Sequence, residues 1–286
     1  MGNRLSVKVL QDSRWNRLVL YLILMTLCLT QLFSVRFLPF SDYHQWVFQG
    51  HLLRVHQDDP AAVAEYFTWA HSPVPNSAFP AVAWLLGKLS SDPEGIAKAF
   101  LAVAIVVYTL GASYLIRSVQ GRPTAVEILP FIWSYGYYVY NGFLSYHLSL
   151  GLFFLSFGYL HRATKGGNER PPALSVLVLM VLSIITYFSH LFGWLPLCIA
   201  VAAYAVRIII RQRDGKSAWL MVSLVPALLL LAWYSAEQSD ALNLTLYDSL
   251  YPTSCLHSSA RSSCFSDWIP LTYRRLRPSF STAWSV

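Results

Sequence analysis

Long runs of uncharged, apolar residues divide this chain from near its N-terminus to about residue 236. A helix needs about 20 largely apolar residues to cross a bilayer, and residues 18–35, 99–116 and 218–236 approach that length. Only 12% of all residues are charged, against about 25% in an ordinary soluble domain. The sequence therefore predicts an all-α fold, a polytopic bundle of transmembrane helices.

Two further runs, residues 128–160 and 173–206, are too long to cross the bilayer once. At 1.5 Å per residue each would form a helix of about 50 Å, whereas the hydrocarbon core is about 30 Å thick. Each run is therefore expected to form two short spans joined by a turn. Residues 140–142 (Tyr-Asn-Gly) and 189–193 are the expected turns, because Gly and Asn suit tight turns.

The basic residues predict the orientation of these spans. Cytoplasmic loops of membrane proteins carry an excess of Lys and Arg, and with two hairpins every basic cluster falls on one side. About seven spans result, with residues 1–17 in the cytoplasm and a transmembrane module over residues 18–236. Within it, residues 36–94 form an external loop. The Ser-rich tail, residues 237–286, is expected outside and without defined structure.

The external loop is expected to hold short helices at the membrane surface. Asp59-Pro60 is a typical helix start, with Asp as the N-cap and Pro at the first helical position. Asp92-Pro93 repeats this pattern before the second long span. Residues 79–89, between them, are apolar but too short to cross the bilayer. This segment is expected along the interface, with Trp84 at the depth of the lipid headgroups.

Asp42 is the first candidate for chemistry, because it closely follows the first span in a loop rich in titratable groups. A carboxylate at the mouth of a membrane cavity can accept the proton of a hydroxyl as that oxygen attacks, which is general-base catalysis. The alternative is structural: Asp42 would cap a helix that begins at Tyr43. Spacing alone favours the cap.

Asp58 and Asp59 form a second acidic candidate, although the helix cap already explains Asp59. The loop histidines, His44 among them, lack the spacing of a zinc site, so neither a metal nor a cofactor is expected. His147 and His190 lie in or beside predicted spans, where polar groups tend to face a cavity. His190 could reach a phosphate or bond a neighbouring helix.

The net charge of +7 does not indicate nucleic acid, because no soluble basic face is available for a phosphate footprint. Membrane lipid is the expected partner, and the sequence does not identify protein partners. Cys28 and Cys198 lie in apolar runs as small hydrophobic residues, whereas Cys255 and Cys264 could pair in an oxidising compartment. Residues 243–245 (Asn-Leu-Thr) form a glycosylation sequon, which has meaning only in a eukaryotic lumen.

Several features follow one another over residues 15–236: a first span, an external loop with an early Asp42, a Pro-rich entry and short paired spans. The entry reads HSPVPNSAFP from His71, and the run from Tyr140 reads YNGFLSYHLSLGLFFL. This order resembles the GT-C fold of polytopic membrane glycosyltransferases, relatives of protein mannosyltransferases and aminoarabinose transferases. The run from Tyr140 is similar to a hairpin in several uncharacterised members.

The resemblance implies transfer of a sugar from a polyprenyl-phosphate donor to an acceptor hydroxyl on the external face, with Asp42 in the position of the acidic catalytic residue of the first loop. A departing phosphate needs positive charge or N–H donors. The external candidates for substrate binding are Arg36, Arg54, Lys88, His190 and His44. Two other functions stay open, a transporter and a catalytically inactive membrane protein of the same fold.

Overall fold

The computed structural model describes residues 14–36, 38–64, 73–164, 173–212 and 219–250. Every regular element in these ranges is a helix, so the predicted all-α fold is confirmed for this part of the chain. By packing, the chain divides into two compact units, Met1–Tyr234 and Ser235–Val286.

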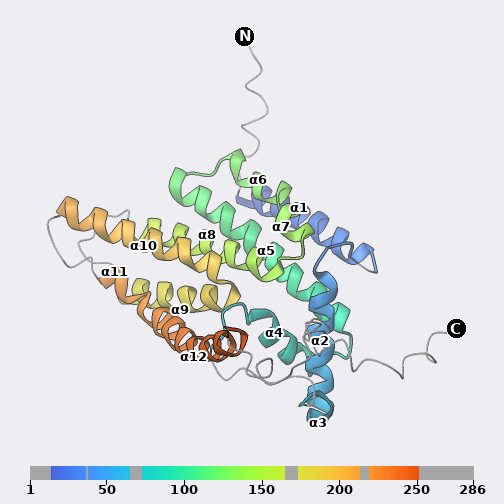
Figure 1. Ribbon diagram of the computed structural model, residues 1–286. Coiled ribbons are helices and arrows are strands. Elements are labelled where there is room, and N and C mark those ends of the chain that lie inside the picture. The colour runs from blue at the N-terminus through green and yellow to red at the C-terminus, as the bar shows by residue number, and fades with distance from the viewer. Residues whose placement is uncertain (1–13, 37, 65–72, 165–172, 213–218, 251–286) are drawn as a thin grey trace, which may run out of the picture. The chain divides into compact units, whose positions relative to one another are not determined.

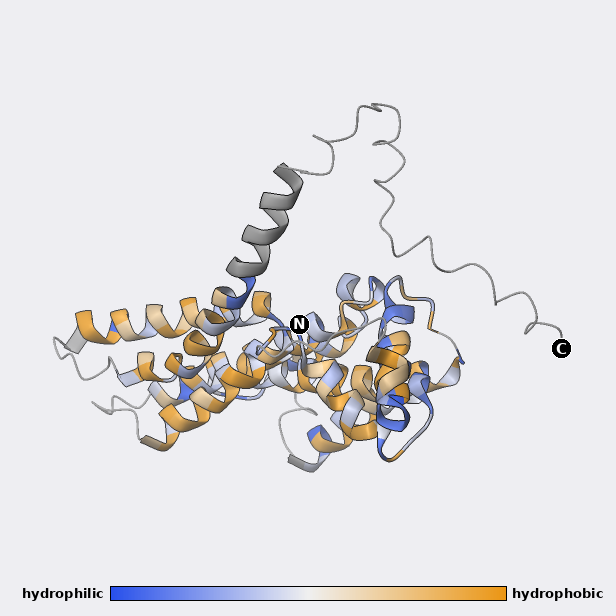
Figure 2. Cartoon of the chain, turned by 60° about the horizontal axis from the view of Figure 1, so that its bottom comes forward, coloured by the Kyte–Doolittle hydropathy of each residue, from blue (hydrophilic) through white to orange (hydrophobic). Residues whose placement is uncertain are grey.

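Among the residues that the structure describes, three helices are long and apolar enough to cross a membrane: α1 (Arg14–Ser34), α5 (Pro93–Gln120) and α10 (Leu191–Gln212). Hydrophobic residues recur along most helices (Figure 2). α1 is the most exposed of the three, because only 6% of its most apolar stretch is buried within the molecule, against 44% for α5. The three helices indicate a membrane protein, and each coincides with a run predicted to span.

α5 and α8 (Leu144–Thr164) pack side by side and run in the same direction (Figure 1). Glycines allow their close approach: a Cβ on Gly151 would lie 2.6 Å from the Tyr108 Cα, and Gly158 meets the α5 backbone similarly. Gly111 of α5 faces the Gly151 carbonyl oxygen. Small residues let helix backbones approach closely in membranes, so these glycines set the spacing of the two helices.

α9 (Ala173–Ser189) and α10 continue the bundle in alternating directions. α9 runs back along α8, since the Tyr159 hydroxyl near the end of α8 donates to the Ser175 Oγ at 3.3 Å. α10 runs with α8, and His161 and Tyr204 near their C-terminal ends share a hydrogen bond of 2.7 Å. The break between α9 and α10 falls at His190, which confirms the turn predicted there.

The segment between α5 and α8 lies along α1. It consists of the 3₁₀ helix η1 (Ala125–Ile128), α6 (Leu129–Ile132) and α7 (Tyr137–Tyr140). The Tyr21 hydroxyl donates to the Glu127 carboxylate at 2.7 Å, and the Tyr135 hydroxyl donates to the Cys28 carbonyl at 2.6 Å. Two short spans are predicted in this run, and α8 is a continuous helix in the place of the second. The first is a broken segment, because Gly136 is extended (ψ −176°) and interrupts the helix.

α11 (Trp219–Val222) and α12 (Val225–Leu250) end the described chain. Leu220 packs in a buried cluster with Leu160 of α8, and Ala227 packs with Tyr187 and Trp194 of α9 and α10. The sequence predicts that this helix ends near residue 236. It continues instead to Leu250.

Three short helices follow α1: α2 (Tyr43–Asp58), α3 (Pro60–Ala64) and α4 (Ala78–Gly87). Both predicted helix starts are confirmed. The Asp59 carboxylate accepts the Ala61 N–H at 3.1 Å, and the Asp92 carboxylate accepts the Glu94 N–H at 3.1 Å. The rest of the helix predicted from Pro60 falls on residues 65–72. These residues lie outside the described part of the chain, and they include the first two residues of the Pro-rich entry.

The C-terminal end of α1 and the N-terminal ends of α5 and α8 lie together, and we call this part of the molecule the loop end. There the Lys98 ammonium donates to the Val35 carbonyl at 2.6 Å, and the Ser41 N–H donates to the Tyr140 carbonyl at 3.1 Å. We call the opposite end the arginine end, after the residues of α1, α5, α8 and α10 that lie toward it: Arg17, Arg117, Arg162 and Arg207.

Candidate functional site

Asp42 occupies the N-cap position of α2, yet its carboxylate makes no capping hydrogen bond. The Gln45 N–H bonds the Asp42 backbone carbonyl instead, at 3.1 Å. Among the residues that the structure describes, the Asp42 carboxylate has no hydrogen bond or ion pair, and its side chain is partly exposed. The carboxylate of an N-cap Asp normally accepts a backbone N–H of the first helical turn. Asp42 therefore has the predicted N-cap position without the capping hydrogen bond, and its carboxylate is available to a ligand.

The backbone of Asp42 lies against the turn at residues 140–142. Gly142 has a φ of +79°, in the left-handed region, and a Cβ added there would lie 2.9 Å from the Asp42 Cα. The predicted turn is thus confirmed, and Gly suits it because it lacks a Cβ. The fold brings two predicted external segments together, the first loop and the turn before α8.

Trp46 ties the first turn of α2 to the same place. Its indole N–H donates to the Gly142 carbonyl at 2.7 Å. Its ring packs edge-on against Phe79 of α4 at 4.9 Å between centroids, and Phe79 packs against Phe100 of α5 at 5.2 Å. Aromatic contacts among three helices therefore hold the first turn of α2, which follows Asp42 directly.

Tyr43, next to Asp42, is fully buried. Burial raises the pKa of Tyr43, and the neighbouring carboxylates of Glu94 and Asp92 add to the shift. The phenol therefore stays protonated and donates to the Glu94 backbone carbonyl at 3.3 Å.

Lys98 is a candidate that the sequence reasoning missed. It lies on α5 at 8% exposure, and its ammonium donates to the Val35 and Arg36 carbonyls, both at 2.6 Å. A single lysine near the start of an apolar run is the signal that could have found it, because a buried ammonium needs partners.

Arg54 and the pair Asp58 and Asp59 serve the loop itself. The Arg54 guanidinium lies 3.1 Å from the Asp58 carboxylate and donates to the Gly87 carbonyl at 2.6 Å. Asp59 caps α3. These contacts give the second acidic pair and Arg54 structural roles, so neither is the first choice for binding a substrate.

His190 separates α9 from α10 at the loop end. Its Nδ1 accepts the Phe192 N–H at 3.2 Å, so its Nε2 carries the hydrogen of the neutral ring. Burial lowers the pKa of His190, which favours that neutral form. The ring packs edge-on against Tyr146 at 5.4 Å, and Tyr146 packs against Tyr138 at 4.6 Å. These aromatic contacts extend from His190 toward the turn that supports Asp42.

His44 and Arg36 also lie at the loop end, on either side of Asp42 in the sequence. Both side chains are exposed, and the His44 ring lies 6.5 Å from the Tyr43 ring. Their positions leave them as candidates for binding a substrate near Asp42.

Two polar side chains are buried deeper in the bundle. His147 stacks on Tyr108 at 4.3 Å between ring centroids, and its Nε2 has no hydrogen-bond partner among the described residues. Glu127 is fully engaged, because its carboxylate accepts the Tyr21 hydroxyl and, at 3.0 Å, the Thr124 N–H. Glu127 therefore links the segment between α5 and α8 to α1.

No group of three or more His, Cys, Asp or Glu side chains in the described ranges is placed to hold a metal ion. Cys28 and Cys198 are unpaired thiols within apolar helices. Cys255 and Cys264 lie outside the described residues, and the sequon at residues 243–245 falls in the last part of α12.

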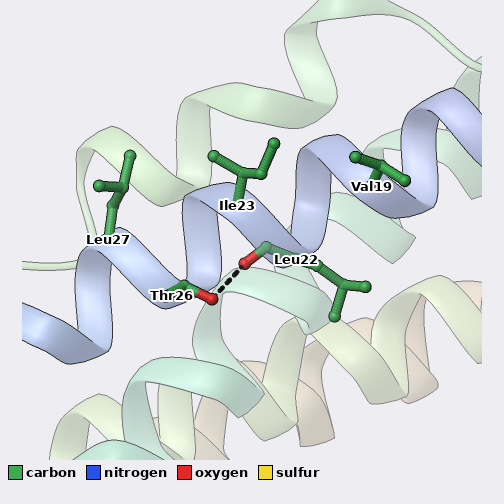
Figure 3. Close-up of a pocket in the computed structure, with 5 residues that line it drawn as sticks. All are labelled: Val19, Leu22, Ile23, Thr26 and Leu27. Carbon is green, nitrogen blue, oxygen red and sulfur yellow. Dashed lines mark hydrogen bonds between the residues drawn. The ribbon is translucent and has the colours of Figure 1, made fainter.

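The exposed face of α1 carries shallow apolar grooves. One, of about 300 Å³, is lined by Val19, Leu22, Ile23, Thr26 and Leu27 (Figure 3). The Thr26 hydroxyl in it donates to the Leu22 carbonyl of its own helix at 2.8 Å. Its lining includes no titratable group, so the groove suits hydrocarbon rather than chemistry.

Comparison of the chain with protein-family models, curated proteins and solved structures finds no match.

Proposed function

We propose that the chain is a membrane glycosyltransferase that moves a sugar from a polyprenyl-phosphate donor to an acceptor hydroxyl at the loop end, with Asp42 as general base. The observation that carries the proposal is the Asp42 carboxylate, which makes no capping bond although its backbone is held by the turn at residues 140–142. A general base needs a fixed place and an unengaged proton acceptor. Asp42 meets both requirements.

The proposal includes a membrane arrangement of about seven spans with a GT-C-like module. Its support is the alternation of α1, α5, the broken segment at residues 125–140, α8, α9, α10 and α12 between the loop end and the arginine end. An excess of arginine on one side is typical of the cytoplasmic face. The N-terminus would then be cytoplasmic, and the first loop and the tail external.

α4 is proposed to lie in the membrane interface on the external side. Trp84 and Leu85 are exposed, and the Lys88 ammonium lies 3.6 Å from the centre of the Trp84 ring. Arg54 and Gln57 of α2 hold α4 through the Gly87 and Trp84 carbonyls. Aromatic and basic side chains favour headgroup depth, so α4 would anchor the first loop to lipid.

In the proposed reaction Asp42 takes the acceptor's proton as the acceptor oxygen attacks the anomeric carbon. The sugar–phosphate bond breaks, and the lipid phosphate leaves with the electron pair. N–H donors must meet the negative charge that develops there. His190, whose Nε2 carries a hydrogen, and Arg36 are proposed for this role, and the Arg54 guanidinium bonds Asp58 and Gly87.

Transport has less support, because it calls for polar groups along a path between the helices. Glu127 is bonded to Tyr21 and Thr124, and Lys98 is bonded to the end of α1. A catalytically inactive protein of the same fold is the remaining alternative.

Membranes that contain the full chain, supplied with labelled polyprenyl-phosphate sugars, test the proposal. Transfer of label to a hydroxyl acceptor is expected, with loss of transfer in Asp42→Ala. Transfer that survives undiminished in Asp42→Ala would exclude Asp42 as the base, and no transfer from any donor would favour the inactive alternative.

A further inference from the structure

The chain that leads from α1 to Asp42 is anchored at its start by Lys98. The Val35 and Arg36 carbonyls follow directly after the last residue of α1, where carbonyls lack partners within the helix. The Lys98 ammonium, on another helix, donates to both at 2.6 Å. A cation is also favoured at a helix C-terminus by the helix dipole, so this contact holds the end of α1 onto α5.

The remaining direction of the ammonium is also occupied. An ammonium has three N–H donors, and the Glu94 carboxylate lies 3.4 Å from the Lys98 Nζ. Lys98 is buried at 8% exposure. It could bind a phosphate only by giving up one of these partners, so its chemistry serves the chain around it.

The same turn of α5 anchors the other side of Asp42. Tyr43 is fully buried, and its hydroxyl donates to the Glu94 carbonyl at 3.3 Å. Its ring packs edge-on against Phe40 at 6.4 Å. Glu94 and Lys98 are one helical turn apart, so residues before and after Asp42 are both attached to the first turns of α5.

We infer that Lys98 and Tyr43 are positioning residues for Asp42. They form a clamp, defined as the contacts of Lys98 with Val35 and Arg36 and of Tyr43 with Glu94, that fixes the backbone of Asp42 while its carboxylate stays unbonded. The inference rests on the proposed function, in which Asp42 is the base. A base acts only within hydrogen-bond reach of its proton, and a misplacement of about 1 Å can lower the rate by about 10²-fold.

The first experiment measures the clamp without reference to activity. A nitroxide is attached at Asp42→Cys in the full chain, with the four native cysteines replaced by Ala, and its mobility is recorded by electron paramagnetic resonance. Lys98→Met removes the donors and keeps the apolar stem, and Tyr43→Phe removes only the hydroxyl. Both should raise the mobility of the label at position 42, while Lys88→Met, at an exposed lysine, should not.

A second label, at Gln49→Cys on the exposed face of α2, separates the clamp from general loosening. Its mobility should stay unchanged in Lys98→Met and Tyr43→Phe. Equal rises at positions 42 and 49 would show that the variants only loosen the fold, and no rise at position 42 would also overturn the inference. If Lys98→Met does not fold, Tyr43→Phe gives the same test with a smaller change.

The second experiment uses the transferase assay with Asp42 intact. Lys98→Met should lower kcat by about 10²-fold. Tyr43→Phe should also lower kcat and should leave the KM of the polyprenyl-phosphate donor nearly unchanged, because the Tyr43 hydroxyl bonds Glu94 and not Arg36, whose carbonyl Lys98 holds. An unchanged kcat would overturn the inference. If the chain with Asp42 intact transfers no sugar, higher mobility of the label at position 42 would support the clamp and remove the proposed function instead.

Discussion

Gly142 and Asp42 are in direct backbone contact, although one precedes α8 and the other precedes α2. A Cβ on Gly142 would lie 2.7 Å from the Asp42 nitrogen and 2.9 Å from its Cα. The contact needs both the positive φ of Gly142 and the absence of its side chain. It makes the place of the candidate base depend on a turn from a distant part of the sequence.

Gly142→Ala should destabilise the protein and displace Asp42. A residue other than Gly in the left-handed region costs about 1–3 kcal/mol, and the added Cβ also collides with the first loop. Thermal unfolding in detergent should show a lower midpoint. Gly50→Ala is the control, because Gly50 lies within α2 and a Cβ added there would meet Pro93 at an ordinary 3.5 Å. Equal midpoints in the two variants would contradict the contact.

Gly151→Ala should separate α5 from α8. The new Cβ would lie 2.6 Å from the Tyr108 Cα, and overpacking of this kind typically costs about 1–3 kcal/mol, because backbone cannot rotate away as a side chain can. Gly50→Ala in α2 is the control, since its Cβ would meet Pro93 at an ordinary 3.5 Å. A Gly151→Ala protein that melts with the wild type would show that the helices are not in this contact.

Acid should weaken the start of α10 through His190. Its Nδ1 accepts the Phe192 N–H, and burial lowers the pKa of His190 from 6.5. The unfolded chain therefore binds the proton first, so the stabilisation is complete above pH 6.5 and is lost as the pH falls below it. His190→Asn, which keeps an acceptor that does not titrate, should flatten the melting midpoint between pH 7 and pH 5 relative to wild type. His44→Asn, at an exposed site, should leave the acid-induced loss in place.

Asp42→Asn should preserve donor binding and lower the transfer rate by about 10²-fold or more, the scale of a lost general base. A single displacement with Asp42 as base also inverts the anomeric centre, so the product linkage should be opposite to that of the donor. Asp59→Asn is the control, because Asn caps a helix about as well as Asp. Full rate in Asp42→Asn, or retained configuration in the product, would remove the mechanism.

Reporter fusions at Lys165 and Asn243 should lie in opposite compartments. The prediction follows from the placement of the basic clusters on one side of about seven spans, with residue 165 inside and residue 243 outside. A glycosylation reporter or a periplasmic enzyme reporter distinguishes the two. The same compartment for both sites would overturn the arrangement.

Local chemistry was readable from the sequence. Apolar runs predicted the positions of α1, α5 and α10, the Asp-Pro pairs predicted the starts of α3 and α5, and the turn residues predicted the breaks at Gly142 and His190. These features depend on the length of an apolar run, on helix-capping residues and on the φ angle of a single residue, and each is a property of a short segment. They can therefore be predicted without knowledge of the tertiary structure.

Only the tertiary structure decided what lies beside Asp42. Three residues from different helices or turns lie at the loop end: Gly142, Trp46 and Lys98. No local sequence pattern predicts that they lie close together. The segment at residues 125–140 shows the same limit, because it satisfies polar groups of α1 rather than forming one continuous helix. Buried polar groups must find partners wherever packing offers them, and packing is a property of the whole chain.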